Sequence, residues 1–214
     1  MNRRAMAPTH PVRSRLLALL NSAPLALLLT LGACGQGAGS AAVERPPLEG
    51  AAIGGDFTLV DKAGKPVRWA DFAGKYRIVY FGYTFCPDVC PLDLQHIMQG
   101  YHLFARDHAA LARDIVPLFI TVDPQRDTPT VMGEYSANFG PELIGLTGTP
   151  ESVAAAGKAF AVYAARRPGA TPGSYLMDHS VTAFLMGRDG KPIALLPAEK
   201  DGKAVAAELA RWVR

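Results

Sequence analysis

Blocks of hydrophobic residues separated by polar segments predict strands and helices in alternation. Residues 76–83 (YRIVYFGY) and 115–122 (IVPLFITV) are continuous runs of aromatic and β-branched residues, which is typical of strands buried on both faces of a sheet. Between them, apolar residues recur at helical spacing, so we expect a long helix that begins at Pro91. Pro117 is unfavourable inside a central strand, so the second strand is expected to start after it.

The remaining blocks complete an α/β pattern. We expect helices over residues 128–139, 150–165 and 201–214, and strands over residues 143–146, 180–186 and 192–196. Turn sequences within residues 58–69 and at residues 188–191 indicate a short hairpin at the start of this region and another near the end. This order predicts a mixed sheet with helices on both faces, a thioredoxin-like α/β architecture with an N-terminal hairpin extension.

The first 33 residues form a separate block that is basic and then apolar. Four arginines and no acidic residue are present, and the apolar run at 16–31 is interrupted by Pro24, a pattern typical of a secretory signal peptide. The run ends in Leu-Gly-Ala-Cys, which resembles the lipobox of bacterial lipoproteins and implies that Cys34 is lipidated. The alternative is an uncleaved transmembrane anchor, because the apolar stretch is nearly long enough to span a bilayer. Both place the rest of the chain outside the cytoplasm.

Residues 34–47 are rich in Gly, Ser and Ala and end in two prolines, which predicts a flexible tether and not a packed core. We therefore expect a lipoprotein signal peptide at 1–33, a tether with lipidated Cys34 at 34–47 and one folded domain at 48–214. The expected location is the periplasmic side of the membrane, as a membrane-anchored bacterial lipoprotein.

The composition excludes two classes of protein. With 49% hydrophobic and 19% charged residues, the chain is not intrinsically disordered. Four of the 22 basic residues lie in the first 33 positions, so the rest of the chain has 18 basic and 19 acidic residues. Such a nearly neutral domain lacks the basic surface that nucleic-acid binding requires, so no nucleic-acid partner is expected.

Two cysteines remain after Cys34, in the motif Cys86-Pro-Asp-Val-Cys90-Pro91 between the first buried strand and the long helix. A purely structural disulfide here would stabilise little, because stabilisation grows with loop length. Pro91 suits the first helical position, so Cys90 is the expected N-cap, and the helix dipole is expected to lower the pKa of both thiols. The motif therefore predicts soft-metal binding, redox chemistry through a Cys86–Cys90 disulfide, or both.

Three sequence blocks occur in one order: YFGYTFCPDVCP at 80–91, TVDPQRDTP at 121–129 and YLMDHS at 175–180. Together they resemble the SCO/SenC family, thioredoxin-fold copper chaperones for cytochrome c oxidase assembly. The resemblance implies that Cys86, Cys90 and His179 bind one copper ion. Two thiolates and an imidazole suit Cu(I) in a three-coordinate site, and Cu(II) could add a further ligand.

Several neighbouring residues are candidates for supporting roles. Asp178 is a candidate for orienting the His179 imidazole, although adjacent side chains on extended backbone point apart. Asp88 either tunes the field of the site or contacts a partner, with simple solvation at a turn as the alternative. The residues expected to hold the second strand to its following helix are Asp123, Arg126 and Asp127.

The other histidines, and all methionines of the domain except Met177, are expected to have no part in the site. The three histidines of the long helix are expected at its solvated face or edges: His96, His102 and His108. Core packing is expected for the methionines of the domain, with Met177 the one candidate for a soft ligand.

Two functions are consistent with these features. The first is a membrane-tethered extracytoplasmic copper chaperone that exchanges copper with other extracytoplasmic carriers and delivers it to the copper-bearing subunit of cytochrome c oxidase. It would bind and transfer, with no catalytic residues. The second is a thiol-disulfide reductase that uses Cys86 and Cys90 to keep the copper-site cysteines of the oxidase reduced.

Overall fold

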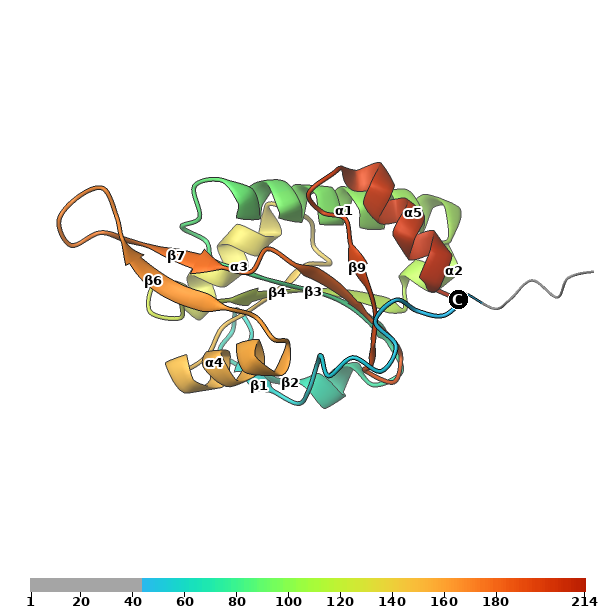
Figure 1. Ribbon diagram of the computed structural model, residues 1–214, viewed down its shortest axis with the longest axis horizontal. Coiled ribbons are helices and arrows are strands. Elements are labelled where there is room, and N and C mark those ends of the chain that lie inside the picture. The colour runs from blue at the N-terminus through green and yellow to red at the C-terminus, as the bar shows by residue number, and fades with distance from the viewer. Residues whose placement is uncertain (1–43) are drawn as a thin grey trace, which may run out of the picture. The chain divides into compact units, whose positions relative to one another are not determined.

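A five-stranded mixed sheet forms the centre of the computed structural model, which describes residues 44–214 (Figure 1). Its strands, in their order across the sheet, are β5 (Ile144–Leu146), β4 (Ile115–Thr121), β3 (Tyr76–Gly82), β8 (Ala183–Met186) and β9 (Pro192–Leu196). β3, β4 and β5 are parallel, whereas β8 pairs antiparallel with both β3 and β9. All seven residues of β3 are buried, as its apolar sequence predicts.

Helices cover both faces of this sheet, which confirms the predicted layering (Figure 1). The helices are α1 (Val89–Asp107), α2 (Ala109–Ala112), α3 (Pro129–Ala137), α4 (Pro150–Ala159) and α5 (Gly202–Trp212). α1, α3 and α5 lie on one face, and α4 lies on the other. α1 and α5 approach closely at Gly100, where a Cβ atom would lie 2.5 Å from the Cβ of Val205. No helix within residues 44–214 is long and apolar enough to cross a membrane.

The predicted N-terminal hairpin is present on the α4 side of the sheet. β1 (Thr58–Val60) pairs antiparallel with β2 (Pro66–Arg68), and the 3-10 helix η1 (Trp69–Phe72) follows. The expected signal peptide, the lipidated Cys34 and residues 34–43 of the expected tether lie outside the described residues.

The second predicted hairpin is formed by β8 and β9, but a further hairpin at residues 164–179 was not predicted. The helix expected over residues 150–165 ends at Ala159, because Phe160 is buried in the core and the chain turns at Ala161 with a left-handed φ of 53°. The chain then forms β6 (Ala164–Pro168), which pairs antiparallel with β7 (Tyr175–His179). This two-stranded hairpin projects from the body (Figure 1).

Three predicted boundaries are wrong for identifiable reasons. α1 begins at Val89, and its N-cap is Asp88 and not Cys90. The backbone N–H of Cys90 donates to Cys86 Sγ at 3.5 Å, so this sulfur accepts the hydrogen bond that a capping side-chain oxygen would otherwise accept. β4 includes Pro117, where it has β3 as its only partner strand, since β5 pairs only from Leu118 onward. β8 starts at Ala183, after His179 has ended β7.

Candidate metal centre

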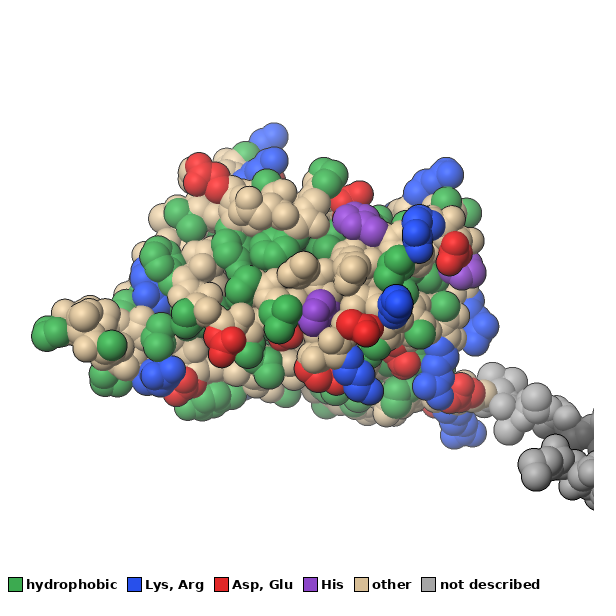
Figure 2. Space-filling model, turned by 90° about the horizontal axis from the view of Figure 1, so that it is seen from above, with side chains coloured by type: hydrophobic (Ala, Val, Ile, Leu, Met, Phe, Trp, Pro, Cys, Tyr) green, Lys and Arg blue, Asp and Glu red, His purple; other side chains and the backbone are tan. Residues whose placement is uncertain are grey.

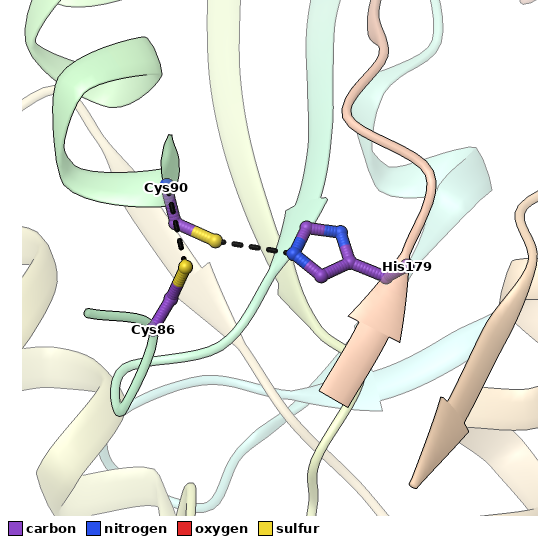
Figure 3. A group of neighbouring side chains, drawn as sticks. All are labelled: Cys86, Cys90 and His179. Atoms are coloured by element: carbon purple, nitrogen blue, oxygen red, sulfur yellow. Dashed lines mark hydrogen bonds between the residues drawn. The ribbon is translucent and has the colours of Figure 1, made fainter. Parts of the chain in front are cut away.

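Cys86, Cys90 and His179 lie together beyond the carboxyl end of β3 (Figure 3). One potential ligand atom from each residue lies within 4.8 Å of the others, and Cys90 Sγ is 3.2 Å from His179 Nε2. This is the one cluster of three or more His, Cys, Asp or Glu side chains found within residues 44–214 that has such a geometry. Two sulfurs and one imidazole nitrogen therefore point to a common centre.

Three different elements position these side chains. Cys86 lies in the loop after β3, Cys90 is the second residue of α1, and His179 is the last residue of β7. Cys90 is fully buried, whereas Cys86 and His179 are half-buried. Gly82 gives the Cys90 sulfur its space, because a Cβ atom there would lie 3.0 Å from Cys90 Sγ and from the ring of Phe119.

The two thiols differ in acidity, contrary to the prediction that the helix dipole lowers the pKa of both. A hydrogen bond from the Cys90 thiol lowers the pKa of Cys86 to about 3, although burial opposes this shift. The same interaction, followed by burial, raises the pKa of Cys90. Two adjacent thiolates in a half-buried site repel each other, so one proton is retained and stays on the more deeply buried sulfur. Both cysteines are free thiols in the structure.

The imidazole of His179 is held by its own backbone neighbourhood. Its Nδ1 lies 2.9 Å from the carbonyl oxygen of Ser180, and because a carbonyl can only accept, Nδ1 donates this hydrogen bond. In the neutral imidazole, Nε2 then has its lone pair directed toward the sulfurs. The ring of Tyr83 meets the imidazole edge-on, with the ring centroids 5.7 Å apart. Both contacts fix the orientation of a potential ligand.

The expected role of Asp178 beside His179 is not found. Asp178 is exposed and accepts a hydrogen bond of 2.6 Å from Arg167 Nε on the outer face of the hairpin, because adjacent side chains of β7 point to opposite sides. The carbonyl of Ser180 takes the place that was expected for its carboxylate. Asp88 is exposed, and its backbone N–H helps to lower the pKa of Cys86, while the role of its carboxylate stays a prediction.

The histidines of α1 lie outside this cluster, but His96 is not solvated as expected. Its Nδ1 lies 2.7 Å from the carbonyl oxygen of Ala198, because the chain entering α5 covers this side of α1. His102 lies 3.2 Å from a carboxylate oxygen of Glu142. Met177 is half-buried and lines a cavity of about 600 Å³ beside α4.

The loop after β4 was expected to hold β4 to its following helix, and it also holds the cysteine loop, which was not predicted. Asp127 is fully buried and accepts hydrogen bonds from the backbone N–H and the hydroxyl of Thr84, at 3.1 and 2.6 Å, and from the hydroxyl of Thr121 at 2.6 Å. Sequence reasoning did not identify Thr84 or Tyr83 as supports of the site. Their position just before Cys86 was the available signal.

Exposed apolar side chains flank the three candidate ligands. Phe85 (52% exposed) and Val89 (38%) are next to the two cysteines in sequence, and Leu92 (48%) and Val181 (53%) each follow a candidate ligand by two residues. We call these four residues the apolar rim. On the face covered by α1 and α5, hydrophobic side chains gather toward the projecting hairpin, whereas most Lys and Arg side chains lie at the opposite end (Figure 2).

Comparisons with known proteins agree with this geometry. A family model described as SCO1/SenC matches residues 45–214. Protein SenC of Rhodobacter capsulatus is 45% identical over 156 residues, which cover 72% of this chain and 64% of that protein. The mitochondrial SCO1 homolog of Homo sapiens is 35% identical over 162 residues, which cover 76% of this chain and 53% of that protein. The chain thus spans less than two thirds of the length of these relatives.

Solved structures confirm the predicted thioredoxin-like fold. Bradyrhizobium japonicum ScoI with copper bound aligns with a TM-score of 0.67 and 39% identity, over 75% of this chain and 99% of that chain. Yeast Sco1 with copper bound aligns with a TM-score of 0.69 and 36% identity, over 76% of this chain and 88% of that chain. The structural neighbours therefore include copper-bound proteins, and this chain has a Cys-Cys-His group that can bind a metal.

Proposed function

The chain belongs to the SCO1/SenC family, and we propose that its domain at residues 48–214 binds one copper ion through Cys86, Cys90 and His179. The observation that supports this most strongly is the convergence of two sulfurs and one imidazole within 4.8 Å. The donor set fits copper, because soft thiolates select Cu(I) and an imidazole also suits Cu(II). A structural zinc site would usually require a fourth protein ligand.

The protonation states of the two thiols determine which cysteine must lose a proton when copper binds. Cys86 is already a thiolate near neutral pH because its pKa is lowered, whereas Cys90 retains its proton. A metal ligand must be deprotonated, so copper binding displaces the Cys90 proton, and the positive ion removes the repulsion between the sulfurs. Nε2 of His179 faces the same centre with its lone pair and can complete three-coordination.

We propose that this domain delivers its copper to the copper-bearing subunit of cytochrome c oxidase and receives it from other extracytoplasmic carriers. A three-coordinate ion leaves room for an incoming thiolate or thioether, so transfer by ligand exchange is feasible. The exchange requires the partner's ligands to come within bonding distance of a half-buried ion, and this brings the partner against the apolar rim. The recipient itself follows from the family resemblance.

Membrane tethering is part of the same proposal. A signal peptide at 1–33, a lipid on Cys34 and a flexible segment at 34–47 would keep the domain close to the periplasmic side of a membrane. The support for this arrangement is the sequence of these residues. Detection of a lipid-modified Cys34 by mass spectrometry of the membrane fraction would test it.

A second candidate function is thiol-disulfide reduction, which the unequal acidity of the two thiols favours. The accessible Cys86 thiolate would attack a partner disulfide and form a mixed disulfide, and one partner sulfur would leave as a thiolate. Cys90, after losing its proton, would then attack Cys86 Sγ and release the second partner sulfur. The partner is reduced by two electrons, and Cys86 and Cys90 are oxidised to a disulfide.

Anaerobic titration of the reduced protein with Cu(I), followed by X-ray absorption at the copper edge, tests the copper proposal. We expect one ion with two sulfur neighbours and one nitrogen neighbour, and a strong loss of affinity in each of the variants Cys86→Ser and Cys90→Ser. Unchanged affinity in both variants would rule out this site. His179→Ala separates the two functions, because copper transfer should fail in this variant while disulfide reduction survives.

A further inference from the structure

The ring of Tyr175, four residues before His179 on β7, lies between two guanidinium groups. The Cζ atom of Arg126 is 3.7 Å from the ring centroid, and that of Arg166 is 3.9 Å from it. The hydroxyl of Tyr175 donates a hydrogen bond of 2.9 Å to Asp123 Oδ1. Cation–π stacking and a charge-assisted hydrogen bond therefore hold the beginning of β7 against the loop after β4.

Arg126 also contacts the segment that leads to the cysteines. Its Cζ atom lies 4.7 Å from the ring centroid of Phe85 and 5.7 Å from that of Tyr83. Its Nη1 donates a hydrogen bond of 3.0 Å to the carbonyl oxygen of Tyr175, and its Nε donates to Asp123. One side chain thus contacts both the strand that carries His179 and the loop that carries Cys86.

We propose that Arg126, Tyr175 and Asp123 form a latch that positions His179 relative to the two sulfurs and thereby determines how well the site holds Cu(II). The proposal rests on the copper site proposed above. β6 and β7 form a separate two-stranded sheet, and a hairpin of two strands is marginally stable by itself. The hairpin therefore depends on contacts with the body, and the latch supplies them at the beginning of β7, the strand that ends at His179.

The latch is expected to affect the two oxidation states of copper unequally. Cu(I) is a soft ion that the two thiolates can hold, and the latch does not support Cys90, which is buried in α1. Cu(II) depends more on the imidazole nitrogen. If the latch is removed and His179 faces the sulfurs for only a tenth of the time, the apparent affinity for Cu(II) falls about tenfold, because apparent affinity scales with the competent fraction.

The matched pair of variants is Arg126→Gln and Arg167→Gln. Arg167 lies on the same hairpin, but it pairs with Asp178 on the outer face, away from the site. For the full-length protein, we would measure Cu(I) affinity by anaerobic competition with a chelator, and Cu(II) binding by thiolate-to-copper absorption and by the nitrogen coupling in electron paramagnetic resonance. We expect Arg126→Gln to weaken Cu(II) binding at least tenfold and Cu(I) binding less than threefold, with both values unchanged in Arg167→Gln.

His179→Ala provides the reference for the mechanism. If Arg126 acts through the imidazole, adding Arg126→Gln to His179→Ala causes no further loss of Cu(II) affinity. Tyr175→Ala removes the stacked ring without changing a core residue and should reproduce the effect if Arg126→Gln fails to fold. Equal losses for both ions, a further loss in the double variant, or a change of less than threefold in Cu(II) affinity would overturn the latch while the copper site itself stands. A wild-type protein that binds neither ion would overturn the copper site, and the latch with it.

Discussion

Replacement of Asp127 by alanine is the sharpest test of how the cysteine loop is held. The carboxylate is fully buried and accepts three hydrogen bonds, two from Thr84 and one from Thr121. Asp127→Ala leaves three donors without this acceptor: the buried hydroxyl of Thr121 and the two half-buried donors of Thr84. An unsatisfied buried donor costs about 1–3 kcal/mol, and a half-buried donor costs less because water can reach it. Burial raises the pKa of Asp127, so removing the charge also relieves a desolvation cost that offsets part of the loss. We expect a net loss of about 3 kcal/mol in the free energy of unfolding.

The assay is equilibrium urea unfolding of the reduced, metal-free protein, with circular dichroism as the readout. Asp178→Ala is the matched control, because Asp178 is exposed and makes a surface ion pair with Arg167, which is worth no more than about 1 kcal/mol. We expect the unfolding midpoint of Asp127→Ala to fall strongly and that of Asp178→Ala to stay close to wild type. A loss of under about 1 kcal/mol in Asp127→Ala would refute the claim that this carboxylate supports the loop.

Three further predictions concern the thiols, the helix packing and the apolar rim. Since the pKa of Cys86 is lowered to about 3, its thiolate persists when the pH falls from 8 to 5. Iodoacetamide should therefore label Cys86 across this pH range and label Cys90 far more slowly. Peptide mass spectrometry measures both rates, and equal labelling of the two cysteines would contradict the prediction. Gly100→Ala should destabilise the protein by about 1–3 kcal/mol in thermal unfolding, because the new Cβ would overlap Val205, and an unchanged melting temperature would disprove this close packing. Leu92→Asp places a charge on the apolar rim, so it should slow copper transfer to an acceptor without changing Cu(I) affinity. Stopped-flow transfer measures the rate and chelator competition measures the affinity. An unchanged transfer rate would argue against docking of the acceptor on the apolar rim.

Local pattern sufficed for much of the fold. The continuous apolar run at β3, the N-cap of α4 at Thr149 and the turn between β8 and β9 were predictable because each depends on residues close in sequence. The β6–β7 hairpin was missed because α4 ends where Phe160 enters the core and Ala161 takes a left-handed conformation. The position at which α4 ends is decided by packing against residues distant in sequence, which local periodicity does not report.

The sequence by itself determined which residue types meet at the site, since the cysteine motif and the block around His179 are specific together. Only the tertiary structure decided how they act. The hydrogen bond with Cys86, together with burial, raises the pKa of Cys90 so that it keeps its proton, and strand alternation turns Asp178 outward to Arg167. These properties depend on distances between segments far apart in the chain, which the order of residues does not state.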